Sequence, residues 1–512
     1  MEKRISFYKW MKKRKFFSVV SGMCCLLCYA KYIYGIYFYQ DADIVLYQQG
    51  TNYNWLDIGR YGLVLLRKVF GTDKANPYYE AVLFLTAFLA LILFFGYFLD
   101  MASNQENSDG KLLIISVIFI TYPLWAEQFY FQFQSFEILA GYLLTLISLF
   151  FSLEGVREKK IAYQIAAVVT AFIAFGVYQS FINVFLTGCV GMCLLNLKEI
   201  SAFREFIRMV KSYVIVFAIA FLGYLFLYRF FFSSSDYLQA GWGSADIKEI
   251  LLHIESYVRM VLSGKIKFFP VTYLLAGVFA LLASIYFYRK EKVKNCWQWP
   301  VSIGLLFALF LSPFLLLFVT GYFTVTRALL VFPLGAALLF YYVYDVFEKR
   351  KGVIFYAVVL LGVVCCLRQT ESLMRIFYTY DIISESDKIT ALQLNYDINR
   401  VLAEEGQMPV AVIGTLDARQ NPACCSEEET GWSFLFQSSI LQNMNMEPKY
   451  YWSTCYFVNW FRMYGIEYAW ASQEQVQMAA EESRSMEVWP KEGGICVRNG
   501  ICIIKLSETE MQ

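Results

Sequence analysis

Charged side chains and histidine are both scarce in this 512-residue chain. Asp, Glu, Lys and Arg make up 17% of the residues, against about 25% in a typical soluble protein, which excludes an ordinary soluble globular fold. The one histidine, His253, leaves neither a histidine-rich metal site nor a Ser-His-Asp hydrolase triad easy to build. The C-terminal segment has no P-loop and no GxGxxG fingerprint, which argues against nucleotide binding there.

The chain contains long runs of apolar residues. Hydrophobic residues make up 58% of the chain, and the run at 301–323 reaches the roughly 20 residues that span a bilayer as a helix. The sequence therefore predicts a polytopic α-helical membrane protein with about eleven spans. The predicted spans lie near residues 17–39, 80–99, 112–125, 134–153, 162–178, 180–196, 212–232, 271–288, 300–320, 327–345 and 353–369.

The distribution of charge predicts an orientation in the membrane. A cytoplasmic N-terminus puts the basic segments "EGVREKK", "REFIRMVKS", "YRKEKVKN" and "FEKRKG" on the inside, as the positive-inside rule expects. An odd number of spans then places the C-terminal segment outside. From Thr370 onward the chain has 20 acidic and 10 basic residues and no spanning run. No stripe of basic and aromatic residues lies away from the membrane flanks, so nucleic-acid binding is not expected.

These patterns predict two domains. Residues 1–369 form a transmembrane domain, and residues 370–512 form a small extracytoplasmic α/β domain. In the second domain, "MPVAVIGTL" has the pattern of a buried strand, and "YFVNWFRMYGIEYAW" predicts an amphipathic helix that leads into a strand. The Asn499–Gly500 pair predicts the turn of a β-hairpin near the C-terminus.

Two long outer loops, at 40–79 and 233–270, interrupt the predicted spans. Both contain amphipathic patterns, which predict helices lying on or in the membrane interface. The first loop presents Asp41 and Asp43 directly after a span, where functional carboxylates mark substrate or ion paths. The alternative is that both are solvated loop residues. The Asp-Ala-Asp pattern would also suit a divalent cation, although no cofactor is required by the sequence.

Positive charge at the outer boundary is available for a phosphate group. Arginine suits phosphate because its donors are planar and it stays charged. Arg60 follows the acids of the first loop, and Arg327 lies in a short outer turn at the start of the tenth predicted span. Lys265 and Lys267 precede the eighth predicted span, where snorkelling to lipid headgroups explains them equally well.

Polar residues at the outer ends of other spans are candidates for a sugar site. Polar groups in spans usually face a cavity or a partner helix. Aromatic faces and amide hydrogen bonds suit pyranose rings. The candidates for substrate binding are Trp55, Asp57, Glu127, Gln128, Tyr178 and Gln179.

The ordered set of these motifs resembles the type II O-antigen glucosyltransferases, a family of polytopic GT-C-class enzymes. The set comprises "DAD…G…W…GR" after the first span, then "YPLWAEQFYFQ", "YQSFINVF" and "TRALLVFP", and finally "VWPKEGGICVRNGICIIKL". The resemblance implies transfer of a hexose from a polyprenyl-phosphate sugar to a cell-envelope glycan on the outer face. An acidic residue of the first outer loop would act as the base.

The first outer loop departs from the family pattern at two positions. Family members often show adjacent acids followed by an arginine, whereas Ala42 separates Asp41 from Asp43 and Leu46 stands where the arginine is expected. When positions are counted back from Gly50 and Trp55, Asp43 occupies the place of the second acid. The base is therefore either Asp43 or Asp41.

The sequence thus predicts an inverting glycosyltransferase in a bacterial inner membrane. Its partners would be a polyprenyl-phosphate sugar, an envelope glycan acceptor and membrane lipid, and Arg327 with Arg60 would stabilise the departing lipid phosphate. One alternative is a flippase or transporter of lipid-linked glycan, which needs charges deep in several spans, where only Lys31 and Arg229 are expected. The other is a non-catalytic envelope scaffold, in which both aspartates would tolerate Asn.

Overall fold

The chain divides into two compact units, which are described separately. The computed structural model describes residues 5–33, 35, 42–47, 55–103, 107–198, 200, 202–232, 247–290, 297–316, 326–348, 352–417, 419–430, 439–442 and 450–508. Unit 1 comprises Met1–Ile36 and Gly50–Met374, and unit 2 comprises Tyr37–Gln49 and Arg375–Gln512. The first outer loop is therefore divided, because its first part groups with the C-terminal residues.

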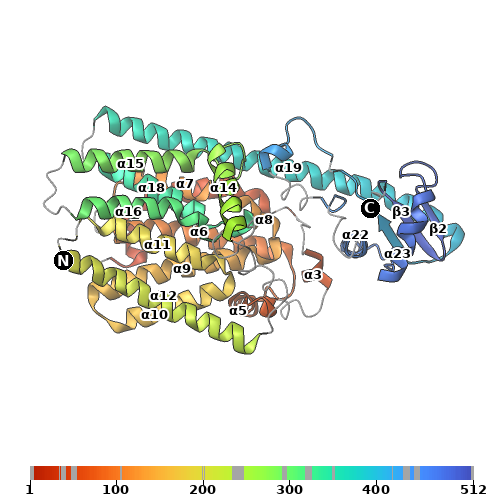
Figure 1. Ribbon diagram of the computed structural model, residues 1–512, viewed down its shortest axis with the longest axis horizontal. Helices are drawn as coiled ribbons and strands as arrows, with labels where there is room; N and C mark the ends of the chain where they lie inside the picture. Colours follow the sequence, from red (N-terminus) through yellow and green to blue (C-terminus); the bar gives the residue numbers. More distant parts are fainter. Residues whose placement is uncertain are drawn as a thin grey trace. The chain divides into compact units, whose positions relative to one another are not determined.

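Unit 1 is helical throughout its described residues, and its long helices run side by side (Figure 1). Its elements are α1 (Phe7–Lys13), α2 (Lys15–Tyr29), η1 (Ala30–Ile33), α5 (Tyr61–Phe70), α6 (Pro77–Ala102), α7 (Asp109–Ile120), α8 (Trp125–Tyr130), α9 (Gln132–Glu158), α10 (Ile161–Val177), α11 (Ser180–Asn196), α12 (Phe203–Phe231), α14 (Ile247–Ser263), α15 (Thr272–Lys290), α16 (Gln298–Leu311), η2 (Ser312–Phe314), η3 (Thr326–Ala328), α18 (Val331–Glu348) and the first part of α19 (Val353–Glu405). Among them, α9 packs against both α6 and α10.

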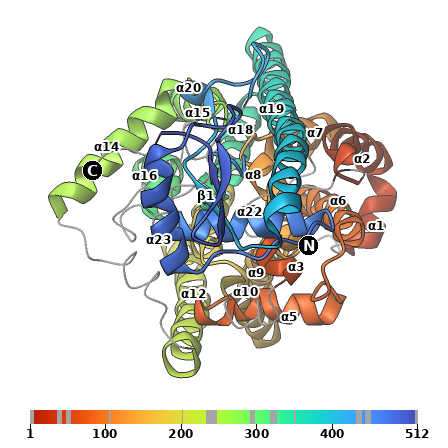
Figure 2. The ribbon, with the colours of Figure 1, turned by 90° about the vertical axis from the view of Figure 1, so that its right-hand side faces the viewer.

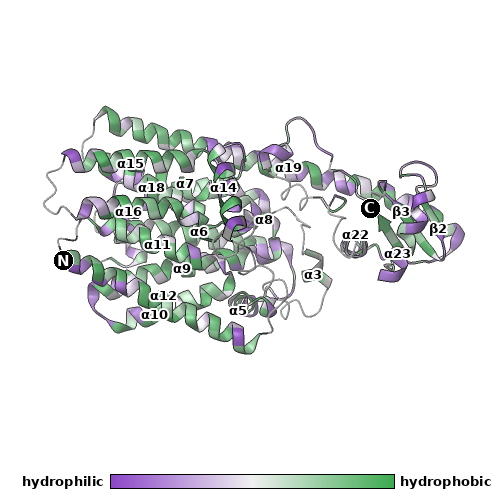
Figure 3. Ribbon diagram, viewed as in Figure 1, coloured by the Kyte–Doolittle hydropathy of each residue, from purple (hydrophilic) through white to green (hydrophobic). Residues whose placement is uncertain are grey.

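Each of the eleven predicted apolar runs coincides with one of these helices. Within the described residues, seven helices are long and apolar enough to cross a membrane, namely α2 with η1, α6, α9, α12, α15, α18 and α19. The other four, α7, α10, α11 and α16, are shorter. Figure 3 shows that hydrophobic residues cover most of the length of the long helices. These helices have the composition of a membrane protein.

The two amphipathic segments of the outer loops are helical, as predicted. Figures 1 and 2 show that α5 and α14 lie across the direction of the long helices of unit 1. Helix α5 docks closely on α10, because a Cβ atom at Gly62 would lie 2.3 Å from the carbonyl oxygen of Ile173. Leu65 and Val69 of α5 remain exposed. An amphipathic helix with one packed and one exposed apolar side suits a membrane interface.

Helix α19 extends far beyond the end of the last predicted span at residue 369. It continues to Glu405 because the sequence from 363 to 405 contains neither proline nor glycine. Gly406 then ends the helix with a φ of 92°, in the region that favours glycine. The first part of α19 belongs to unit 1 and the second part to unit 2.

Unit 2 contains a three-stranded sheet and several helices. Its strand order is β1-β3-β2, with β1 parallel and β2 antiparallel to β3. The β2–β3 turn confirms the predicted hairpin, since Asn499 and Gly500 both have positive φ, at 49° and 73°. The strand predicted after the amphipathic helix forms a single bridge, between Trp470 and Val410. The elements are α3 (Ala42–Tyr47), the second part of α19, β1 (Val410–Ile413), α20 (Glu427–Thr430), α22 (Tyr451–Met463), α23 (Gln473–Glu482), η4 (Ser483–Ser485), β2 (Ile495–Arg498) and β3 (Ile501–Lys505).

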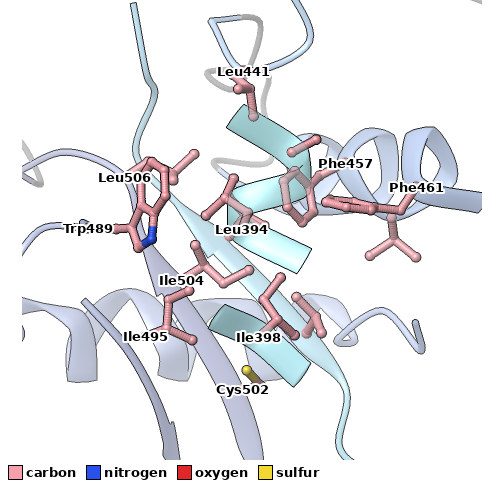
Figure 4. Close-up of a cluster of buried hydrophobic side chains, with 14 of the residues drawn as sticks. Leu394, Ile398, Leu441, Phe457, Phe461, Trp489, Ile495, Cys502, Ile504 and Leu506 are labelled. Carbon is pink, nitrogen blue, oxygen red and sulfur yellow. The ribbon is translucent and has the colours of Figure 1, made fainter. Parts of the chain in front are cut away.

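Side chains along a strand point alternately to the two faces of a sheet, and both faces of this sheet are buried. Cys502 and Ile504 of β3 belong to a cluster with residues of α19 and α22. Figure 4 shows this cluster, in which Leu394 and Phe457 lie near Ile504. Ile501 and Ile503 of β3 pack with α23, and Figure 2 shows the sheet between α23 and α22. Helix α3 also packs against α22.

Candidate functional site

The start of α9 carries contacts to two of the arginines singled out from the sequence. We call residues 131–137 the α9 start segment. The Nη1 atom of Arg60 donates a hydrogen bond of 3.2 Å to the side-chain oxygen of Gln134. The guanidinium carbon of Arg327 lies 4.6 Å from the centre of the Phe131 ring. Two cations from distant parts of unit 1 therefore flank the first turn of a 27-residue helix, whose N-terminus is itself electropositive.

The surroundings of Arg327 bring together residues that the sequence predicts to bind substrate. The side-chain nitrogen of Gln128 donates a hydrogen bond of 2.8 Å to the carbonyl oxygen of Arg327. Glu127, the preceding residue of α8, is 1% exposed and interacts electrostatically with Arg327. Its Oε1 atom has no hydrogen-bond partner among the described residues. The η3 turn and α8 thus form one polar cluster next to the α9 start segment.

Burial changes the ionisation of Glu127, which lies outside the seven candidate spans. Burial raises the pKa of this carboxyl from 4.5 to about 7, and the nearby Arg327 opposes the shift. Between these two values the folded protein keeps the proton that the unfolded chain releases. The free energy of unfolding contributed by Glu127 therefore falls as the pH rises from about 4.5 to about 7.

We expect Glu127→Gln to remove this pH dependence, because the amide cannot ionise. The thermal midpoint of the variant, measured in detergent from pH 5 to pH 8, should rise relative to wild type up to about pH 7 and then level off. Glu255→Gln, the same substitution at an exposed position of α14, is the control. A midpoint difference that shrinks as the pH rises would show that Glu127 is ionised in the folded protein.

Arg60 lies within the second group of predicted substrate-binding residues. Its guanidinium carbon is 4.7 Å from the centre of the Tyr178 ring. The side-chain nitrogen of Gln179 donates a hydrogen bond of 2.6 Å to the carbonyl oxygen of Ile58, in the turn that precedes Arg60. Asp57 is half-buried in the same turn. The structure therefore brings the end of α10 together with the second part of the first outer loop.

A third arginine at the α9 start segment was not expected from the sequence. Arg67 of α5 is 1% exposed and donates a hydrogen bond to the carbonyl oxygen of Phe133. It forms ion pairs with two fully buried carboxylates, at 3.9 Å to Glu80 and 3.6 Å to Glu137. Trp55 covers this group, with its ring centre 4.8 Å from the guanidinium carbon of Arg67.

These buried acids add two charged residues at the starts of spans to the Lys31 and Arg229 expected from the sequence. Glu80 and Glu137 lie near the first turns of α6 and α9, in segments where the neighbouring residues are apolar. A carboxylate in such a segment signals a buried partner. The pairing was not expected because the partner, Arg67, lies on an amphipathic helix whose pattern predicts a position at the membrane interface.

The two predicted lysines have separate surroundings. The Nζ atom of Lys267 lies 3.6 Å from a carboxylate oxygen of Glu371, in the part of α19 that belongs to unit 1. Lys265 is exposed just after α14. The charge of Lys267 is therefore partly offset, and Lys265 is free to reach lipid headgroups in the way that snorkelling residues do.

The two aspartates proposed as the base are only partly described. Asp41 and the side chain of Asp43 lie outside the described residues, and Asp43 is the second residue of α3 in unit 2. Among the residues whose side chains are described, no three His, Cys, Asp or Glu residues gather into a metal site. Because the two aspartates are not among those residues, a divalent cation at Asp41 and Asp43 stays a prediction.

The comparison with known families covers the elements of unit 1 that follow η1, up to residue 371 in α19. The family model for the glucosyl transferase GtrII matches residues 33–371, more than half of the chain. No curated protein and no solved structure matches the chain. The matched residues include the first outer loop, the α9 start segment and the turn that carries Arg327. The chain therefore belongs to the GtrII glucosyl transferase family.

Proposed function

We propose that this protein transfers a glucosyl residue from a polyprenyl-phosphate donor to a glycan of the cell envelope. The observation that carries the proposal is the placement of Arg60 and Arg327 around the α9 start segment. Guanidinium groups bind phosphate oxygens through planar, charge-assisted hydrogen bonds. A helix N-terminus adds further positive potential. A donor that arrives in the lipid phase needs no nucleotide pocket, which agrees with the absence of nucleotide motifs in the C-terminal segment.

The reaction is an inverting displacement at the anomeric carbon. The carboxylate of Asp43 or Asp41 takes the proton from the acceptor hydroxyl while its oxygen attacks the anomeric carbon. The bond from that carbon to the lipid phosphate breaks, and the electron pair leaves with the phosphate. Arg327 and Arg60 stabilise the negative charge that develops on this leaving group. No oxidant, reductant or cofactor is needed for the step to balance.

The sugar is recognised by the polar and aromatic residues next to the two arginines. Tyr178 and Gln179 lie beside Arg60, and Glu127 and Gln128 lie beside Arg327. Aromatic rings offer a flat apolar face, while amides and carboxyls supply directional hydrogen bonds. This division of labour suits a pyranose, which has both apolar faces and hydroxyl edges.

The proposed cellular setting follows from the family, and the proposed orientation follows from the charge pattern of the sequence. The protein resides in a bacterial inner membrane with its N-terminus in the cytoplasm, and the α9 start segment faces the outer side. Residues 370–512 then lie outside the cytoplasm. The donor reaches the site laterally through the membrane, and the acceptor glycan approaches from the outer aqueous phase.

Arg327→Gln is expected to lower the rate of glucosyl transfer by about 10²–10³-fold, as removal of one stabilising donor at a developing negative charge does. The assay uses the full-length protein in detergent, a radiolabelled polyprenyl-phosphate glucose and envelope glycan. Arg327→Lys keeps the charge but not the planar donors, and should recover part of the rate. Arg259→Gln, at an exposed position of α14, is the matched control and should transfer like wild type.

The same assay separates the enzyme from its alternatives. Detergent micelles have no second compartment, so a flippase gives no product in them. Absence of transfer by the wild type, together with movement of the labelled lipid across vesicles, would replace the transferase proposal with a flippase. Transfer by Arg327→Gln at the wild-type rate would show that Arg327 does not stabilise the departing phosphate.

A further inference from the structure

A groove lies between three helices of unit 1, away from the proposed transfer site. Its volume is about 560 Å³. Helices α10 and α12 form its two walls, and the last turn of α9 closes one end. Apart from Gln164, the wall residues are aliphatic over about 12 Å of α10, from Ile161 to Val169. The lining residues are Gly155, Val156, Lys159, Ile161, Gln164, Ile165, Val168, Val169, Arg208, Lys211, Ser212, Ile215, Val216 and Ile219.

The floor of the groove at one end is fixed by hydrogen bonds between the helices. The Oε1 atom of Gln164 accepts a hydrogen bond of 3.0 Å from Ser212, and its Nε2 atom donates one of 3.2 Å to the carbonyl oxygen of Ser152. Gly155 permits this approach, since a Cβ atom there would lie 2.1 Å from the Gln164 nitrogen. The groove is therefore a built feature of three helices.

Three cations stand at this same end. Lys159 follows the last residue of α9, and Arg208 and Lys211 lie one turn apart on α12. All three are exposed, and none pairs with a carboxylate among the residues that the structure describes. The nearby acids do not neutralise them, because Glu158 pairs with Lys160 at 3.6 Å and Glu205 forms no ion pair within the described residues.

The backbone at Lys159 also favours a role for its side chain. Its φ is 55°, in the region where a helix end normally carries glycine. A lysine at such a position is costly to the backbone, so the groove end holds a positive side chain where a neutral residue would fit better.

We propose that this groove binds one phospholipid with an anionic headgroup. An aliphatic trough matches an acyl chain, and three cations at one end match a phosphate, as in basic pockets between spanning helices. Because the three cations attract negative charge, the groove should bind an acidic lipid of the surrounding bilayer. The site is separate from the proposed donor site, because Arg60 meets Tyr178 just past the opposite end of α10, a 17-residue helix about 25 Å long. The inference rests on membrane insertion and not on the transferase activity.

Native mass spectrometry of the full-length protein in detergent tests the proposal with dioleoyl phosphatidylglycerol as the probe. We expect one copy to bind in preference to dioleoyl phosphatidylcholine. Arg208→Gln/Lys211→Gln should weaken this binding about tenfold or more, since each basic residue at the lipid surface contributes about a factor of five. Arg289→Gln/Lys290→Gln, an exposed basic pair at the end of α15, is the matched control and should bind like wild type.

Two further variants test separately how the positive charge and the aliphatic trough contribute to lipid binding. Lys159→Gly suits the backbone and should lower phosphatidylglycerol binding without lowering the thermal midpoint. Ile165→Trp fills the aliphatic wall while keeping every charge, and should also lower binding. Equal binding by wild type and the Arg208/Lys211 variant would overturn the proposal. Displacement of phosphatidylglycerol by polyprenyl phosphate at equal concentration would also overturn it, by showing that the groove prefers the donor lipid.

Discussion

Asp43→Asn is expected to lower glucosyl transfer by about 10²–10⁴-fold, the usual contribution of a general base. Asn keeps the size of the side chain and its acceptor oxygen but cannot take the proton of the acceptor hydroxyl. The measurement is transfer from labelled polyprenyl-phosphate glucose to envelope glycan, with the amount of folded protein matched by size-exclusion chromatography. A base acts after binding, so the maximal rate should fall while the donor concentration at half-maximal rate changes little.

Two companion variants make this result specific. If Asp43, which fits the position of the second acid in the family motif, is the base, Asp41→Asn should retain most of the activity. Asp73→Asn changes an exposed aspartate later in the first outer loop and serves as the matched control. Activity lost in Asp41→Asn but kept in Asp43→Asn would show that Asp41 is the base. Full activity in both would show that neither Asp41 nor Asp43 is the base.

The placement of α3 gives the C-terminal residues a role that the sequence did not suggest. Asp43 lies in a helix of six residues, which is too short to be stable alone. That helix packs against α22 within unit 2, and Ala42 is buried there. Unit 2 therefore supplies the packing that holds the proposed catalytic helix in a helical conformation. The acidic C-terminal part is in this respect a support for the first outer loop.

Local patterns predicted the parts of the fold that depend on short-range physics. The apolar runs became helices because their length and composition leave no other way to satisfy the backbone in lipid. The Asn499–Gly500 turn formed because only such residues accept positive φ at both positions. The sequence singled out Glu127, Gln128 and Arg327 separately, because each is a polar residue in apolar surroundings, and the structure shows that they lie together.

Other features depend on contacts between distant segments, which one sequence does not reveal. Arg67 and Glu137 are 70 positions apart, and nothing local marks them as partners. The pairing of α3 with α22 joins segments about 400 residues apart. The lipid groove requires the relative placement of α9, α10 and α12. In each case the residue types were visible, and only the packing of the helices assigned their partners.

The second large effect is expected at Arg67. Arg67→Met removes the one positive charge that the structure shows beside Glu80 and Glu137, and leaves two carboxylates buried without compensation. Both carboxylate oxygens of Glu80 already lack hydrogen-bond partners among the described residues. Removing one member of a buried ionic group costs about 3–5 kcal/mol of unfolding free energy. We therefore expect a sharply lower thermal midpoint in detergent and a reduced yield of folded protein.

A rescue experiment tests whether the uncompensated charge is the cause. Adding Glu80→Gln and Glu137→Gln to Arg67→Met removes both negative charges, and should recover much of the lost stability. Arg259→Met is the matched control, because its ion pair with Glu255 is exposed and should contribute under about 1 kcal/mol. If the triple variant is no more stable than Arg67→Met, the loss comes from the hydrogen bonds of Arg67 to the carbonyl oxygens of Phe133 and Thr72. In that outcome the arginine acts chiefly by tying α5 to the α9 start segment, and neutralising the two glutamates is secondary.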